Sequence, residues 1–219
     1  MTKPFKLLVF DWDGTVMDSE SRIVACVDAA IRDLELPHRS IDEVKNIIGL
    51  GLKEAVQTLY PGSGDDLMQQ IIERYRRHYL EVDQTPSPLF PGARETLEQL
   101  NLEGYLLAVA TGKGRIGLEK VFDETNTREL FVTSRCADES FSKPHPQMLE
   151  AVIDFCGVMP DETLMIGDTE YDMQMAINAK TAALAVCYGV HTPERLMQFQ
   201  PLACMESITD IPSWLQQLT

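Results

Sequence analysis

The chain has 219 residues and a formal net charge of −15, with 44% hydrophobic and 24% charged residues. Such a chain can bury the core of one α/β domain with a smaller inserted domain, or of a single large domain. The acidic balance argues against nucleic acid and against a membrane surface as partners, because both bind proteins through Lys and Arg.

No run approaches the roughly 18 apolar residues that a membrane helix needs, and the N-terminal apolar run is too short for a signal peptide. The five cysteines are odd in number, widely spaced and without a C-x-x-C pair. We therefore predict free thiols and a reducing, cytoplasmic location. These cysteines are Cys26, Cys136, Cys156, Cys187 and Cys204.

The first predicted element is a buried strand over the apolar run Leu7 to Phe10. Asp11 and Asp13 follow it directly, and an extended chain points residues two apart to the same side. In an open α/β sheet, ligands bind at the C-terminal ends of the strands. The alternative is an Asp-rich turn that only closes the strand, with Gly14 completing the turn.

After Ser19 the spacing of apolar residues becomes helical, and no convincing strand follows for about sixty residues. The pattern predicts four helices, one carrying Ile23 to Leu34, a short one after a capping box at Ser40, one from about Leu52 to Tyr60 and one carrying Leu67 to Tyr79. We predict that residues 16–85 form a helical cap domain, and that residues 1–15 and 86–219 form the core domain.

A proline-rich connector over residues 86–92 leads into a regular alternation of helices and strands. This alternation predicts a Rossmann-like, mainly parallel sheet with helices on both faces. Helices are expected over 93–103, 115–124, 146–156 and 171–179, and strands over 106–110, 131–133, 164–166 and 182–186.

Polar residues follow two further strands of this predicted sheet. Thr111 and Gly112 follow one strand, and Asp168 follows another, with Asp172 four residues beyond it. Lys143 lies between them, in a loop that prolines restrict. A glycine lets backbone N–H groups approach an anion. Each piece could instead be an ordinary turn, a helix cap or a solvated side chain, but their common place at strand ends favours a phosphate or metal site.

These residues together resemble the four motifs of the haloacid dehalogenase superfamily, and the resemblance covers essentially the whole chain. The nearest subgroup is phosphoglycolate phosphatase-like, which shares the run from Asp13 to Ser19, Pro91-Gly92 and Ser142-Lys143-Pro144. Two positions depart from the usual pattern. Trp12 stands where Leu or Met is more usual, and Gly112 stands where Asn or Ser often contacts the phosphate.

The resemblance implies that Asp11 is the nucleophile and that Asp13 is the general acid and base. A carboxylate that attacks a phosphate dianion needs a nearby cation, since the two repel by ~4 kcal/mol per unit charge pair at 4 Å and an effective dielectric constant of 20. Mg²⁺ suits this role because it prefers oxygen ligands. Asp11, the Asp13 carbonyl group and Asp168 are its predicted ligands.

Three further residues complete the predicted site. Lys143 would add positive charge at the phosphate and the nucleophile, and Thr111 would donate from its hydroxyl group. Asp172 is predicted to orient Lys143 or a metal-bound water. In the cap, Lys53 and Arg22 are predicted to contact the substrate, and the alternative is that both are solvated.

The leading hypothesis is a phosphatase that acts on a small phosphorylated metabolite, either phosphoglycolate-like or a sugar phosphate. A phosphomutase of the β-phosphoglucomutase type would use the same aspartates. A phosphonate hydrolase would need a cap lysine such as Lys53, and a non-catalytic binding protein would be expected to lack a motif aspartate. Asp13 counts against a dehalogenase. The oligomeric state stays open between monomer and dimer.

Overall fold

The computed structural model describes residues 3–218. Its centre is a six-stranded sheet of order β3-β2-β1-β4-β5-β6, in which every neighbouring pair is parallel. This confirms the predicted fold class. The strands are β1 (Leu7–Phe10), β2 (Leu106–Thr111), β3 (Thr133–Cys136), β4 (Thr163–Gly167), β5 (Ala182–Val186) and β6 (Cys204–Met205).

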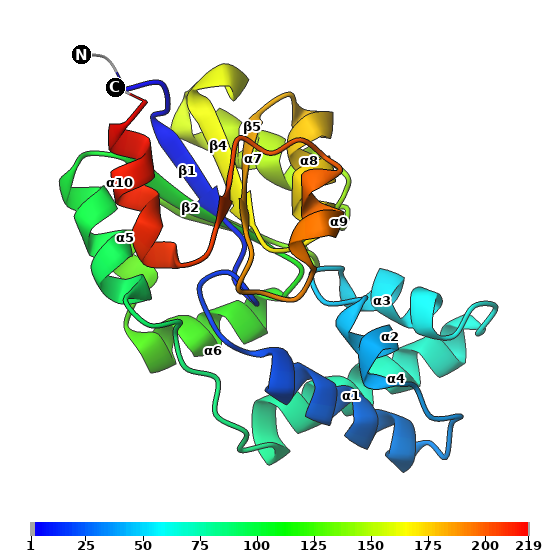
Figure 1. Cartoon of the computed structure of the whole chain (residues 1–219). Helices are drawn as coiled ribbons and strands as arrows, with labels where there is room; N and C mark the ends of the chain where they lie inside the picture. The colour runs from blue at the N-terminus through cyan, green and yellow to red at the C-terminus, as the bar shows by residue number, and fades with distance from the viewer. Residues whose placement is uncertain (1–2, 219) are drawn as a thin grey trace.

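Helices cover both faces of the sheet (Figure 1). Successive residues of a strand face opposite sides, so Leu8 and Phe10 of β1 pack on one layer, whereas Leu7 and Val9 pack on the other. The first layer contains α5 (Ala93–Leu102), α6 (Arg115–Thr125) and α10 (Ile211–Gln216), and the second contains α7 (Gln147–Cys156), α8 (Glu170–Ala179) and α9 (Pro193–Met197).

The strand order places β1 at the centre, between β2 and β4. The chain adds strands to one side of β1 and then returns to build the other side, so the order reverses beside β1. In open α/β sheets, the crevice for ligands lies at such a reversal, outside the carboxyl ends of the strands. Asp11, Thr111 and Asp168 all lie at this edge, directly at or after the ends of β1, β2 and β4.

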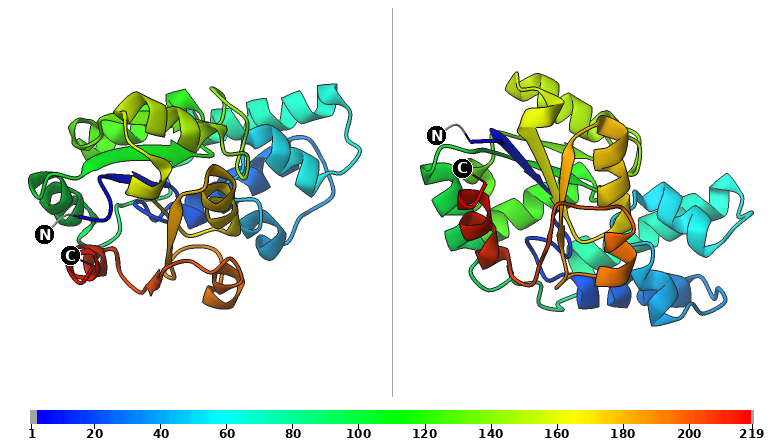
Figure 2. Two further views of the ribbon diagram at one scale, coloured as in Figure 1. Left: turned by 90° about the horizontal axis from the view of Figure 1, so that it is seen from above. Right: turned by 45° about the horizontal axis from the view of Figure 1, so that its top comes forward.

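The segment between β1 and α5 forms a helical unit beside the sheet (Figures 1 and 2). Apart from Val190, its hydrophobic cluster contains only residues of this segment. The capping box at Ser40 is present, since the backbone N–H of Glu43 donates to Ser40 Oγ. The helices are α1 (Glu20–Asp33), α2 (Ile41–Lys45), α3 (Leu52–Leu59) and α4 (Asp65–Arg77), and a π-helical turn over His78–Val82 follows.

Some elements differ from the sequence expectation. Strand β3 begins at Thr133, two residues later than expected, and α9, β6 and α10 after β5 were not expected. Each of these last three elements has six residues or fewer, which is too short to show a periodic apolar pattern. Within the described residues, no helix is both long and apolar enough to cross a membrane.

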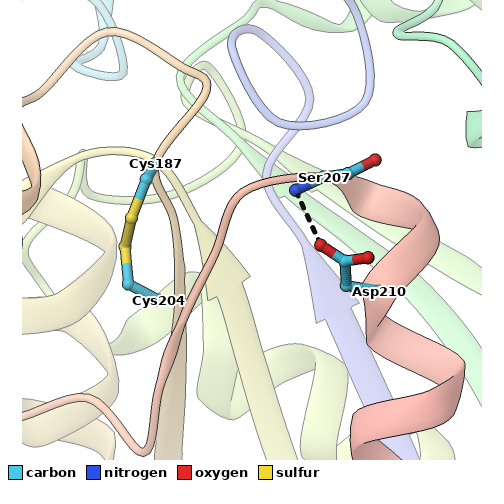
Figure 3. The surroundings of a disulfide bond; sticks show 4 residues. All are labelled: Cys187, Cys204, Ser207 and Asp210. Carbon is cyan, nitrogen blue, oxygen red and sulfur yellow. Dashed lines mark hydrogen bonds between the residues drawn. A yellow bond between two sulfur atoms is a disulfide. The ribbon is translucent and has the colours of Figure 1, made fainter.

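The expectation of five free thiols is wrong for two of them. Cys187 and Cys204 form a disulfide that links the end of β5 to β6 (Figure 3). Their separation of 17 residues gives no pairing signal, but adjacent strands bring the two Cα atoms to 5.9 Å, within the usual disulfide range. Cys26, Cys136 and Cys156 are free.

Candidate active site

The centre of the site is the buried carboxylate of Asp11, directly after β1. Its backbone N–H donates to the carbonyl oxygen of Ile166 at 2.9 Å, which holds it against the end of β4. Lys143 Nζ lies 2.8 Å from Asp11 Oδ1, and both side chains are almost fully buried. Burial raises the pKa of Asp11 well above its usual range, and the nearby charge of Lys143 opposes this only in part.

Lys143 is held between two carboxylates. It donates to Asp172 Oδ1 at 2.6 Å while it pairs with Asp11. Burial lowers the pKa of Lys143, but Asp11 and Asp172 raise it by more, so the ammonium group stays charged at neutral pH. The structure therefore brings Asp172 to Lys143, one of the two partners that were predicted for it.

Asp172 is fixed from the other side by the start of α8. Thr169 donates to Asp172 Oδ2 from its backbone N–H at 3.1 Å and from its hydroxyl group at 2.7 Å. Both oxygens of Asp172 thus accept hydrogen bonds from other residues. This geometry suits a side chain that positions Lys143.

Asp168 lies in a tight cradle at the end of β4. Thr15 Oγ1 donates to its Oδ1 and the Val190 backbone N–H donates to its Oδ2, each at 2.8 Å. A Cβ atom at Gly14 would lie 2.2 Å from Asp168 Oδ2, and one at Gly189 would lie 2.4 Å from the same atom. Burial and the nearby charge of Asp172 raise the pKa of Asp168 to about 7.

The donor set fits a divalent cation. Asp11, Asp168 and Asp172 each offer a carboxylate oxygen, and these atoms lie within 4.8 Å of one another. Asp11 Oδ2 is buried and accepts no hydrogen bond. Because burying several carboxylates together is costly without compensating charge, such a cluster is suited to a cation that prefers oxygen ligands.

The side chain of Asp13 is directed to a different set of partners. Ser19 Oγ donates to Asp13 Oδ1 at 2.6 Å, and Lys113 Nζ lies 3.0 Å from Asp13 Oδ2. Lys113 also donates to the hydroxyl group of Tyr79 in the helical unit at 2.8 Å. Sequence reasoning did not single out Lys113 or Ser19. The sequence did contain one indication for Lys113, because it directly follows Thr111-Gly112 at the end of a predicted strand.

Thr111 and Gly112 lie where β2 ends. The backbone N–H of Lys113 donates to Thr111 Oγ1 at 3.2 Å, which leaves the hydroxyl hydrogen of Thr111 able to donate. A Cβ atom at Gly112 would lie 2.4 Å from the carbonyl oxygen of Gly49. Glycine at this position therefore lets the loop between α2 and α3 approach the sheet edge.

Three hydrogen bonds hold the loop between α2 and α3 against the core. The backbone N–H of Gly51 donates to Ser142 Oγ at 2.7 Å. Tyr171 donates to the carbonyl oxygen of Asn46, and Arg195 donates to its Oδ1, both at 2.7 Å. The loop thus lies over the carboxyl edge of the sheet, beside the aspartates.

The two predicted cap residues do not lie at the site. Arg22 is buried at the base of the helical unit, where it donates to the carbonyl oxygens of Tyr79 at 2.9 Å and Asp83 at 3.3 Å. Lys53 is exposed on α3. Neither is among the described residues that line the cavity above the aspartates. Arg22 instead links α1 to the π-helical turn and to Asp83 directly after it.

Comparisons with known proteins show which family the chain belongs to. The family described as haloacid dehalogenase-like hydrolase matches residues 8–186. A probable phosphatase, IndB, of Dickeya dadantii (strain 3937) is 32% identical over 209 residues, which cover 94% of this chain and 91% of that protein. A phosphoglycolate phosphatase of Aliivibrio fischeri is 30% identical over 210 residues, or 92% of each chain.

The fold is shared with solved structures as well. The crystal structure described as a predicted phosphoglycolate phosphatase from Haemophilus somnus superposes with a TM-score of 0.84 at 27% identity, covering 98% of this chain and 99% of that one. The chain therefore belongs to the haloacid dehalogenase-like hydrolases and is an enzyme of their phosphoglycolate phosphatase-like group.

Proposed function

We propose that the protein is a Mg²⁺-dependent phosphatase of a small phosphorylated metabolite and that it acts through a phosphoryl group carried on Asp11. The observation that most directly supports this proposal is the buried Asp11 carboxylate. It has one oxygen without a hydrogen bond and lies beside both Lys143 and Asp168. The proposal also takes residues 16–85 to be the cap domain of the enzyme.

Each side chain has a role that follows from its contacts. Asp11 attacks the phosphorus atom, and the alcohol leaves with a proton from Asp13. Asp13 then takes a proton from the water that hydrolyses the aspartyl phosphate. Lys143 stabilises the charge that develops on the phosphoryl oxygens, and Thr111 donates a hydrogen bond to them.

Asp11, Asp168 and the carbonyl group of Asp13 would hold Mg²⁺. When bound, the ion neutralises part of the phosphate charge and aligns the phosphate with the nucleophile. Asp172 keeps Lys143 in place through its 2.6 Å hydrogen bond. Ser19 and Lys113 hold Asp13 between substrate turnovers through their contacts with its two carboxylate oxygens.

The test combines one substitution with removal of the metal. We expect Asp11→Asn to lower kcat for p-nitrophenyl phosphate by about 10⁴-fold or more while the fold is retained, because the nucleophile is lost. Asp18→Asn, seven residues away and exposed, is the matched control and should keep its activity. Chelator should abolish the activity of the unmodified protein, and Mg²⁺ should restore it.

Two results would contradict the proposal. One is hydrolysis by folded Asp11→Asn at the rate of the Asp18→Asn control, and the other is full activity in excess chelator. Release of inorganic phosphate from a sugar phosphate, rather than transfer to a second sugar position, separates the phosphatase from a phosphomutase.

A further inference from the structure

A cavity of about 180 Å³ extends from the catalytic aspartates into the helical unit. Asp11 and Asp13 lie at one end, together with Lys113. From there the wall continues along α1, α3 and α4, as far as Leu59 and Ile72. The cavity is thus continuous with the place where the phosphate is expected to bind.

The wall of this cavity is mainly apolar. Apart from four glycines and five charged residues, every described residue that lines it is aliphatic, an alanine or a tyrosine. Three of the charged residues belong to the site, and the other two, Arg76 and Asp138, have exposed side chains. Asp138 is committed to the start of α6, where its carboxylate accepts the backbone N–H of Arg115.

Ile48, Val56 and Ile71 of the helical unit line the cavity, and they keep 3%, 4% and 5% of their exposure. Their apolar side chains therefore still face solvent from within the cavity. Transfer of apolar surface out of water is favourable, so an apolar group that fills the cavity would be stabilised by covering these side chains.

Resting on the proposed phosphatase function, we propose that the organic group of the substrate is apolar and occupies this cavity. A cavity of about 150 Å³ is known to accept benzene, so this one holds a single aromatic ring or an alkyl chain of about six carbons. The side chains of α1 and α3 that line the cavity are all aliphatic, so a carboxylate or several hydroxyl groups placed against them would lose their hydration without finding partners. The substrate class is therefore aryl and alkyl phosphate monoesters, and phosphoglycolate is a poor substrate.

The experiment measures kcat/KM for methyl, butyl, hexyl, decyl and phenyl phosphates and for phosphoglycolate, all with saturating Mg²⁺. We expect kcat/KM to rise about fourfold per methylene up to about six carbons, the fold-change that corresponds to ~0.8 kcal/mol per buried methylene. It should stop rising before decyl phosphate. In calorimetry, hexylphosphonate should bind with higher affinity than methylphosphonate. This measurement does not depend on turnover.

Matched substitutions locate the effect. Val56→Thr places a hydroxyl group in the cavity wall, and Val44→Thr makes the same change in the helical unit's core at a residue that does not line the cavity. We expect only Val56→Thr to lower the ratio of hexyl to methyl phosphate kcat/KM, by about fivefold, as burial of a hydroxyl group without a partner predicts. Ala55→Leu fills part of the cavity and should shorten the optimal chain.

The outcomes separate the two proposals. Mg²⁺-dependent, Asp11-dependent hydrolysis without any dependence on chain length, or with phosphoglycolate preferred, overturns the inference about the cavity and leaves the phosphatase standing. Equal effects of Val56→Thr and Val44→Thr on the ratio also overturn it. Absence of Mg²⁺-dependent hydrolysis for every ester overturns the phosphatase function and this inference with it.

Discussion

Lys143 is the residue on which the charge balance of the site depends. It is the cation that contacts both Asp11 and Asp172, and all three side chains are nearly inaccessible to solvent. Breaking a buried ion pair from one side leaves an uncompensated charge, whereas loss of a surface pair changes little. The stability of the core and the chemistry of the site therefore share this lysine.

We expect Lys143→Met to lower the free energy of unfolding by about 3–5 kcal/mol. Lys6→Met, which removes a surface pair with Glu162, should cost far less. Urea unfolding of both variants at pH 7 measures the difference. Added Mg²⁺ should stabilise both variants, because both keep the proposed metal ligands, and equal losses in the two variants without Mg²⁺ would contradict this account.

His191 makes the stability depend on pH. Burial lowers its pKa to about 4, with Arg195 adding to the effect and Glu170 and Asp172 opposing it. Its Nδ1 accepts the backbone N–H of Glu170, and its Nε2 is buried without a partner. The folded chain therefore keeps the ring neutral over a pH range in which the unfolded chain protonates it.

The sign follows from linkage: a lowered histidine pKa contributes stability above the unfolded value near 6.5, and this contribution is lost as the pH falls toward 4. The loss reaches roughly 3 kcal/mol at pH 4. We expect His191→Asn, which keeps an acceptor for the N–H of Glu170, to lose less stability between pH 7 and pH 4.5 than the unmodified protein. An equal loss of stability in the variant and the unmodified protein between these two pH values would disprove this role.

At the scale of elements, the π-helical turn contacts α6 and the loop that precedes it, and these contacts join the helical unit to the core. Lys113 donates to the Tyr79 hydroxyl group at 2.8 Å, and Lys120 donates to the carbonyl oxygen of Leu80 at 2.6 Å. Tyr79 also stacks on Tyr75, with ring centroids 5.8 Å apart. Lys113 also pairs with Asp13, the proposed general acid. A change in the position of the helical unit would therefore alter the contacts of Asp13.

We expect Tyr79→Phe to increase amide hydrogen exchange over residues 78–82, because a hydrogen bond from a charged donor, ~1.5–3 kcal/mol, is lost. Tyr75→Phe is the control, since it removes the hydroxyl group of the stacked ring and leaves the hydrogen bond between Lys113 and Tyr79 in place. KM should rise in the Tyr79 variant, because Lys113 loses a hydrogen bond that holds it beside Asp13. Equal exchange in the two variants would show that the bond does not hold the elements together.

The short strand β6 depends on its covalent link to β5. It has two residues and pairs with β5 through two register positions, so it has little of its own to hold it at the sheet edge. A disulfide that closes a loop of this length stabilises by about 3 kcal/mol in the chain-entropy treatment.

We expect the unfolded, unreduced chain to titrate three thiols and the reduced chain to titrate five. Reductant should lower the Tm of the unmodified protein. Cys156→Ser, which removes a free thiol, should show the same fall in Tm on reduction, and Cys187→Ser should show none. Five thiols without reductant would exclude the disulfide.

At the scale of the whole molecule, the net charge of −15 means that the positive groups at the site must attract an anionic substrate. An anionic substrate approaches against the overall field, so the attraction must be local. Lys143 and Lys113 supply it, and both are buried next to carboxylates. The molecule thus keeps its site cations neutralised by aspartates until a phosphate and a metal enter.

The sequence by itself determined the parallel α/β core, because apolar runs and turn residues alternate with clear periods there. It also located Asp11, Thr111 and Asp168, since strand ends in such a sheet meet at one edge. For Asp172, the family resemblance left two roles open, to orient Lys143 or a metal-bound water, and the structure adds its 2.6 Å hydrogen bond with Lys143.

Only the tertiary structure decided the contacts between segments that are distant in the chain. The pairing of Cys187 with Cys204, the contact of Lys113 with Tyr79 and the direction of Arg22 toward Asp83 all depend on how the elements pack. The apolar cavity is of the same kind, because periodicity shows that a helix has an apolar face but cannot show whether neighbouring faces meet or leave space between them.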